Sequence, residues 1–204
     1  TIAFAKEKKY LLNRLKSYIA SRERASMFDE ATTTDVRYTF LLVLHSCILL
    51  GLCIYHYYTQ EMPTLLEKIA HFYLLGGTIL LVCFLFMIKC ALYSFINWTF
   101  FQKAKNSAWI TSFFNLFIWF GILLLPIILV IIYFDISSQI SLYLIGFLII
   151  FAKISLFWKC FSNFFEKIHG AFHLILYFCA LEILPDLIFW KGIELVNNNL
   201  ILNL

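Results

Sequence analysis

The chain has 204 residues, of which 62% are hydrophobic and only 14% are charged, and its net charge is +4. A soluble domain is closer to half apolar and one quarter charged, so this composition excludes an ordinary water-soluble fold. It predicts an all-α protein, a transmembrane helix bundle that crosses the bilayer several times.

Basic residues gather at the start of the chain. Residues 4–24 alternate apolar and basic positions at helical spacing, which predicts an amphipathic helix on a membrane surface, bound to anionic lipid headgroups. A solvated helix packed on its own domain is the alternative. Nucleic acid is not expected as a partner. We assign residues 1–37 to this basic segment; the Lys and Arg residues in it are Lys6, Lys8, Lys9, Arg14, Lys16, Arg22, Arg24 and Arg37.

The remaining residues, 38–204, read as a transmembrane bundle. A helix needs about 20 apolar residues to cross the hydrocarbon layer. Five stretches meet this requirement, and they cover residues 38–58, 70–96, 112–134, 140–160 and 171–192.

Two of these stretches contain proline. Pro126 lies in the third and Pro185 in the fifth, and each is expected to kink its helix because proline removes a backbone donor. Residues 1–5 are apolar and precede a basic run, so they resemble the end of a further upstream span.

Loop charges predict the orientation. The N-terminal flank and the loops 97–111 and 159–170 hold most of the loop Lys and Arg, whereas 59–69 and 135–139 hold only Lys68. The positive-inside rule therefore places the N-terminal flank in the cytoplasm and the C-terminus outside.

Four ionisable residues fall inside the predicted spans: His45, Lys89, Lys153 and Glu182. Such groups are costly in lipid and are candidates for function. Counting residues along each span puts all four in the cytoplasmic half, where they could form a buried polar cluster. Glu182 is expected to face the interior with Lys153 or Lys89 as its partner, although both lysines could instead snorkel to the headgroups.

A metal site has weaker support. Glu166, His169 and His173 share one helix face and offer ligands that suit a transition metal. This spacing is also common by chance at a polar helix start, so no metal or other cofactor is predicted. The motifs of nucleophile elbows, phosphate loops and zinc proteases are missing from the sequence, which argues against an enzyme.

Three stretches resemble one known family. They are residues 22–30 before the first span, residues 92–98 at the end of the second, and residues 172–185 with the Leu-Glu-Ile-Leu-Pro motif at 181–185. The chain resembles a bacterial inner-membrane family classed only as a domain of unknown function, numbered four-two-seven-one. The resemblance covers nearly the whole chain and implies a further span before the basic helix. It implies no activity, cofactor or catalytic residue.

Three functions remain open on this evidence. The first is a non-enzymatic protein that works through a membrane-protein partner or as a homo-oligomer. The second is a small transporter or channel subunit with Glu182 in its path. The third is a membrane-embedded enzyme.

Overall fold

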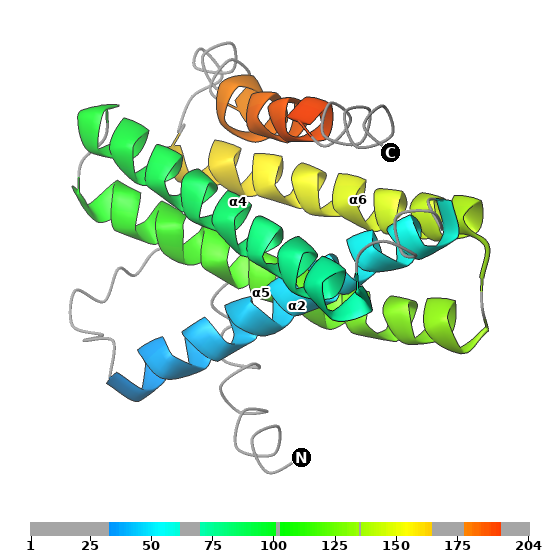
Figure 1. The fold of residues 1–204 in the computed structure, drawn as a ribbon. Coiled ribbons are helices and arrows are strands. Elements are labelled where there is room, and N and C mark those ends of the chain that lie inside the picture. The colour runs from blue at the N-terminus through cyan, green and yellow to red at the C-terminus, as the bar shows by residue number, and fades with distance from the viewer. Residues whose placement is uncertain (1–32, 62–69, 101–102, 135, 165–177, 193–204) are drawn as a thin grey trace. The chain divides into compact units, whose positions relative to one another are not determined.

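The structure is a computed structural model, and it describes residues 33–61, 70–100, 103–134, 136–164 and 178–192. Every regular element in these ranges is helical (Figure 1), which confirms the all-α fold class. The long helices are α2 (Thr33–Glu61), α4 (His71–Phe100), α5 (Lys103–Tyr133) and α6 (Ser138–Phe164).

The last described segment combines two kinds of helix. It begins with the π-helix η2 (Cys179–Ile183) and continues as an α-helix over 184–192. We refer to residues 178–192 as the C-terminal helix.

Four helices are long and apolar enough to cross a bilayer. Their apolar parts are Arg37–Glu61, His71–Ile96, Trp109–Tyr133 and Ser138–Phe161. They correspond to the first four predicted spans. The fifth predicted span enters the described residues only from 178 onward, and the basic segment 4–24 lies outside them.

Helix ends differ from the predicted span ends. Helix α5 begins at Lys103, well before the predicted start at 112, and α2 begins at Thr33, inside the segment assigned to the interface. Hydropathy detects only the part of a helix that matches the hydrocarbon, whereas hydrogen bonding continues into the polar flanks. Helix α5 also continues through Pro126, and a kink there stays a prediction.

The chain divides into two compact units. Among the described residues, the first contains α2, the start of α4 as far as Cys83, and Thr111–Leu156; the second contains Phe84–Ile110 and the described part of Phe157–Leu204. Helices α4, α5 and α6 thus contribute residues to both units.

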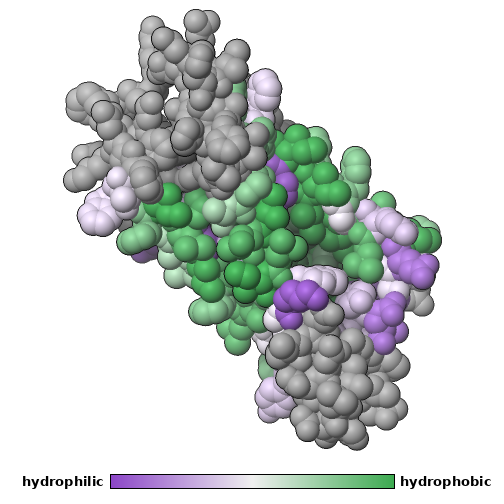
Figure 2. Space-filling model, turned by 90° about the horizontal axis from the view of Figure 1, so that it is seen from above, coloured by the Kyte–Doolittle hydropathy of each residue, from purple (hydrophilic) through white to green (hydrophobic). Residues whose placement is uncertain are grey.

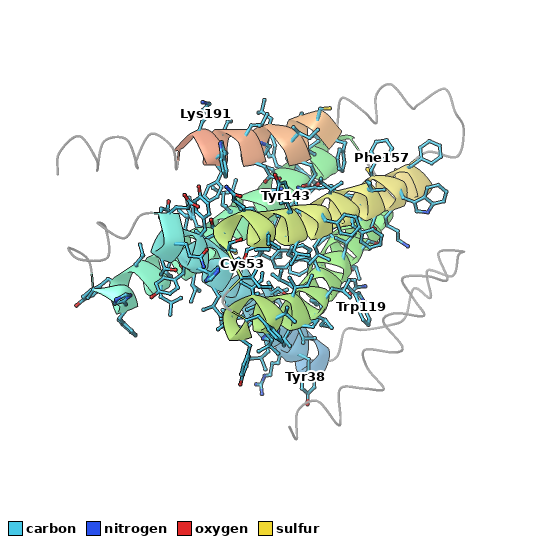
Figure 3. The ribbon with its side chains drawn as sticks, turned by 90° about the vertical axis from the view of Figure 1, so that its right-hand side faces the viewer. Tyr38, Cys53, Trp119, Tyr143, Phe157 and Lys191 are labelled. Carbon is cyan, nitrogen blue, oxygen red and sulfur yellow. The ribbon has the colours of Figure 1, made fainter. Side chains whose placement is uncertain are left out.

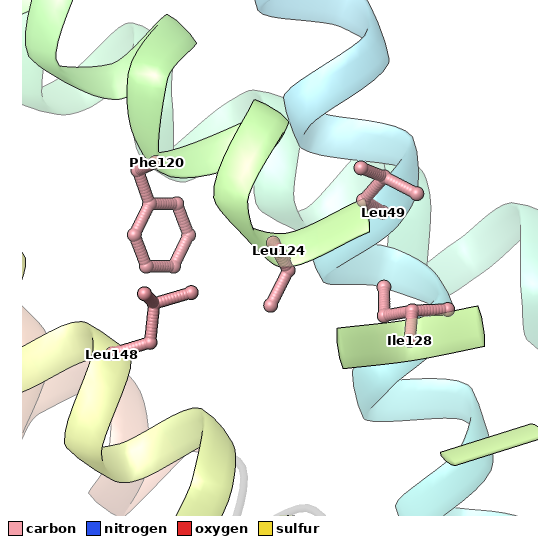
Figure 4. Close-up of a cluster of buried hydrophobic side chains, with 5 residues drawn as sticks. All are labelled: Leu49, Phe120, Leu124, Ile128 and Leu148. Carbon is pink, nitrogen blue, oxygen red and sulfur yellow. The ribbon is translucent and has the colours of Figure 1, made fainter. Parts of the chain in front are cut away.

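The first unit is centred on an apolar cluster contributed by α2, α5 and α6 (Figure 4). The side chains of its members are entirely apolar and pack between these helices. They are Leu49, Phe120, Leu124, Ile128 and Leu148.

Two glycines allow helices of the first unit to approach closely. A Cβ atom added to Gly121 would collide with Ser46, lying 2.6 Å from its Cβ and 3.0 Å from its Cα. A Cβ added to Gly51 would lie 2.9 Å from Ile79 Cα. Small residues at such crossings are typical of helix packing in membranes, where close backbone contact replaces the hydrophobic driving force.

Polar contacts join the end of α2 to neighbouring segments of the first unit. Gln60 Nε2 donates to the carbonyl of Ile136 at 3.3 Å, and Ser138 Oγ donates to Glu61. Tyr55 Oη and His71 Nδ1 lie 2.8 Å apart. These bonds tie α2 to the start of α4 and to the turn between α5 and α6.

The surface of the described helices is largely apolar. Hydrophobic residues cover much of the coloured face in the space-filling view (Figure 2). In α4 and in α6, only 17% of an apolar stretch of 18 residues is buried. Tyr143 on α6 is one of many exposed large side chains (Figure 3). Such a surface would be unfavourable in water and fits the interior of a bilayer.

Candidate functional site

The candidate site lies in the second unit, where α4 meets the C-terminal helix. Lys89 and Tyr93 stand one turn apart on α4, so their side chains leave the same face of that helix. Glu182 belongs to η2, and Asp186 follows one turn later. We call these four residues the ion-pair cluster.

Lys89 bridges the two carboxylates of this cluster. Its Nζ lies 2.7 Å from Glu182 Oε2 and 2.8 Å from Asp186 Oδ1. The Tyr93 hydroxyl donates to the other oxygen of Glu182. Both carboxylate oxygens of Glu182 therefore accept a hydrogen bond, one of them from a charged donor.

Exposure falls steeply across the cluster. The side chain of Glu182 is 1% exposed and that of Lys89 is 13% exposed, whereas that of Asp186 is 45% exposed. Glu182 is thus closed off from the surroundings of the protein, while Asp186 lies at the surface of the unit.

Aromatic side chains pack against one another in the same unit as the ion-pair cluster. The ring of Tyr93 packs edge-on against that of Trp109, with centroids 5.5 Å apart, and both side chains are fully buried. Phe157 on α6 (Figure 3) packs in the same manner against Phe178, with centroids 5.3 Å apart. The low exposure of Glu182 implies a low local dielectric, which strengthens its ion pair with Lys89.

The backbone around Glu182 departs from regular α-helix. The amide of Leu184 donates to the carbonyl of Cys179, five residues earlier, which is the π-helical pattern. Pro185 follows directly, and it has no N–H for the carbonyl of Leu181. The sequence therefore explains why regular helix hydrogen bonding is interrupted beside the carboxylate.

Pairing explains how these charges are tolerated. An isolated ionised group in a low-dielectric interior is strongly unfavourable, whereas a hydrogen-bonded pair of opposite charges recovers most of that penalty. Removing Lys89 would leave Glu182 buried without this cation, whereas removing Glu182 would leave Lys89 paired with Asp186.

The structure divides the predicted polar cluster between the two units. Lys89 and Glu182 come together in the second unit, whereas His45 on α2 and Lys153 on α6 belong to the first, where both are half-buried. The partner that the structure gives to Glu182 is Lys89, one of the two lysines considered.

The candidate metal ligands Glu166, His169 and His173 lie outside the described residues. Within the described ranges, no group of three or more His, Cys, Asp or Glu side chains is arranged to hold a metal ion. The metal site therefore stays untested.

Three residues of this region were not among the predicted site residues. Tyr93 and Asp186 complete the cluster, and Lys159 is a further buried charged residue of the second unit. A spacing signal was available for two of them, because Lys89 and Tyr93, like Glu182 and Asp186, are four residues apart. Two polar pairs with this spacing on two apolar helices favour a paired site.

Long apolar helices, an apolar outer surface and a buried ion pair define an α-helical membrane protein. The chain belongs to the family described as "Domain of unknown function (DUF4271)", whose model matches residues 1–193. Neither the curated proteins nor the solved structures contain a match to this chain.

Proposed function

We propose that the protein is a non-enzymatic component of a membrane assembly in the bacterial inner membrane. One observation carries this proposal: Glu182 is 1% exposed and is bonded to Lys89 and Tyr93. A group that carries an ion or a substrate must be reached from water, whereas a closed and paired carboxylate serves to hold helices together.

The apolar surface supplies the second part of the argument. Much of α4 and α6 is uncovered, so these helices contact lipid or the helices of another protein. A protein that pairs its buried carboxylate Glu182 with Lys89 and presents apolar faces outside is suited to association within the membrane. The exposed faces are therefore the surfaces on which a partner is expected.

Loop charge supports an orientation with the N-terminal flank in the cytoplasm and the C-terminus outside. Anionic lipid headgroups are the proposed contact of residues 4–24. Single cysteines in the 97–111 and 59–69 loops, in a chain whose native cysteines are replaced, should react with a membrane-impermeant reagent from the cytoplasmic and outer sides respectively. Labelling of the 59–69 loop from the cytoplasm would contradict this topology.

Copurification tests the assembly itself. The full chain, tagged and expressed at native level, is cross-linked in native membranes and then purified in mild detergent. A second membrane protein recovered in a fixed molar ratio supports the proposal, provided that an unrelated tagged membrane protein does not recover it. Recovery of the chain without any such partner, before and after cross-linking, contradicts it.

A small transporter or channel subunit is the second candidate. The observation in its favour is the π-helix at Glu182, because short π-helical segments within α-helices occur frequently at functional sites. Proteoliposomes containing only this chain should then show proton or cation flux that Glu182→Gln abolishes. Among the described residues, no arrangement of side chains favours an enzyme, either with or without a metal ion.

A further inference from the structure

The most exposed large hydrophobic side chains among the described residues gather at one end of the first unit. Five of them are at least 75% exposed, and all five are aromatic. They lie at the start of α4, at the end of α5 and near the start of α6. We call them the aromatic belt, and its members are Phe72, Tyr73, Tyr133, Phe134 and Tyr143.

Hydrogen bonds show that these helix ends lie together in the first unit. Gln60, near the end of α2, donates to the carbonyl of Ile136 in the turn between α5 and α6. Tyr55 on α2 bonds to His71, the first residue of α4. The aromatic belt therefore occupies one end of the unit, although its members come from three helices.

The side chains change in character along the helices of this end. Glu61 and Ser138, which share a hydrogen bond, lie at the very ends of α2 and α6. Further into each helix than the belt, the exposed residues are purely apolar, as at Leu80 on α4, Leu129 on α5 and Phe147 on α6. The sequence from polar to aromatic to apolar follows the chemistry of a bilayer from headgroups to hydrocarbon.

The depth of the belt matches the thickness of the headgroup layer. Tyr133 is the last residue of α5, whereas Tyr73 and Tyr143 lie two and five residues inside α4 and α6. With a rise of about 1.5 Å per residue, the three tyrosines occupy roughly 8 Å along the helices. The interfacial layer on each side of the hydrocarbon is about 5–8 Å thick.

We propose that the aromatic belt binds the interfacial layer of the bilayer, where phospholipid headgroups meet acyl chains, and thereby fixes the height of the first unit in the membrane. A tyrosine ring suits this layer because its apolar body contacts the chains while its hydroxyl reaches headgroups and water. Water alone would be unfavourable for Phe72 and Phe134, and hydrocarbon alone would be unfavourable for the tyrosine hydroxyls. This inference does not depend on the proposed assembly.

A docked helix of another protein fits the belt less well. Such a helix packs along one or two helices, so the residues that it contacts recur every three or four positions down the axis. The belt instead runs across three helices at one level. The apolar faces of α4 and α6 below the belt stay available to lipid tails or to a partner.

The depth of single residues tests the proposal. A fluorescent amino acid is placed in the full chain at Tyr73, or at Leu80 as the matched control on the same helix, which is 71% exposed. The chain is reconstituted in phosphatidylcholine vesicles that contain nitroxide lipids. The nitroxide is attached either close to the headgroup or close to the end of the acyl chain.

The shallow nitroxide should quench the probe at Tyr73 more strongly, and the deep nitroxide should quench the probe at Leu80 more strongly. The two probes should differ in depth by roughly 10 Å, which is the length of seven helical residues. Probes at Tyr133 and Tyr143 should report the shallow layer. Stronger quenching at Tyr73 by the deep nitroxide, or quenching there by neither nitroxide, overturns the inference.

A second measurement tests whether the belt fixes the height of the unit. With the probe kept at Leu80, the double change Tyr73→Ala and Tyr133→Ala should shift its depth by about 3 Å, since interfacial tyrosines help to set the position of membrane helices. Leu129→Ala with Phe147→Ala is the control, and it should leave the depth of the probe unchanged. Equal depths in both variants and the parent chain would overturn this role of the belt.

Discussion

At the centre of the first unit, helices meet through apolar side chains and glycines, whereas in the second unit α4 meets the C-terminal helix through charged side chains. The apolar cluster around Leu124 contains no polar atom, and Gly121 brings its helix directly against Ser46. The ion-pair cluster joins α4 to the C-terminal helix through Lys89 and Glu182.

The contrast follows from the solvent. Apolar side chains gain little by moving from lipid into a protein, so the first unit depends on close packing. The second unit uses charge interactions at low dielectric, so the loss of Lys89 is costly because Glu182 then stays buried without this cation. Mutations should therefore act differently on the two units.

The largest effect is expected at Lys89. Lys89→Met leaves Glu182 buried without its cation and should lower the free energy of unfolding by about 3 kcal/mol. The double change Lys89→Met with Glu182→Gln should cost less than the sum of the two single changes. Unfolding in denaturing detergent, followed by Trp fluorescence, measures both; strictly additive effects would contradict the pair.

Gly121 should give the next largest effect. Gly121→Ala places a methyl group against the backbone of Ser46, so the two helices must separate, at roughly 2 kcal/mol. Gly146→Ala is the control because its added Cβ meets nothing within 4 Å, and alanine favours a helix there. The unfolding assay should rank the two variants in opposite directions from the parent chain, and equal stabilities would argue against close packing at Gly121.

Leu124 tests how far packing alone supports the first unit. Leu124→Ala opens a cavity in the apolar cluster, but the transfer contribution known from soluble proteins is absent, so the loss should be about 1.5 kcal/mol. The neighbouring Leu123 is exposed, and Leu123→Ala should change stability by only a few tenths of a kcal/mol. A loss at Leu123 as large as that at Leu124 would show that the cluster is not the core.

The smallest effect is expected at Tyr93. Tyr93→Phe removes one hydrogen bond to Glu182 while Lys89 remains, and should lower stability by about 1 kcal/mol. Tyr143→Phe is the matched control, since Tyr143 is highly exposed on α6. If the two variants unfold alike, the Tyr93 hydroxyl has no part in holding Glu182.

Hydropathy alone predicted four of the helices, because a run of about 20 apolar residues has few other uses. Helix ends were harder to place. Helix α5 begins at Lys103, and its first residues include polar ones that give no hydrophobic signal. They nevertheless belong to the hydrogen-bonded helix.

The ion-pair cluster includes two of the residues that the sequence analysis singled out. Depth along each span selected Lys89 and Glu182, but it also selected Lys153 and His45, since counting residues gives height in the membrane and says nothing about rotation round the helix. Spacing within each helix would have added Tyr93 and Asp186. Only coordinates could show which lysine shares a face with Glu182.

The ion pair also has a consequence for biogenesis. Lys89 and Glu182 are 93 residues apart, so at about 5–20 residues per second the ribosome needs roughly 5–20 s to supply the carboxylate after the lysine. During this interval the helix with Lys89 is already at the translocon without its counter-charge, and the long lysine stem can keep the ammonium among the headgroups. Glu182, which has the shorter side chain, is synthesised later and enters the membrane after Lys89 is already present. The order of the two charges along the chain thus suits the order in which the helices are inserted.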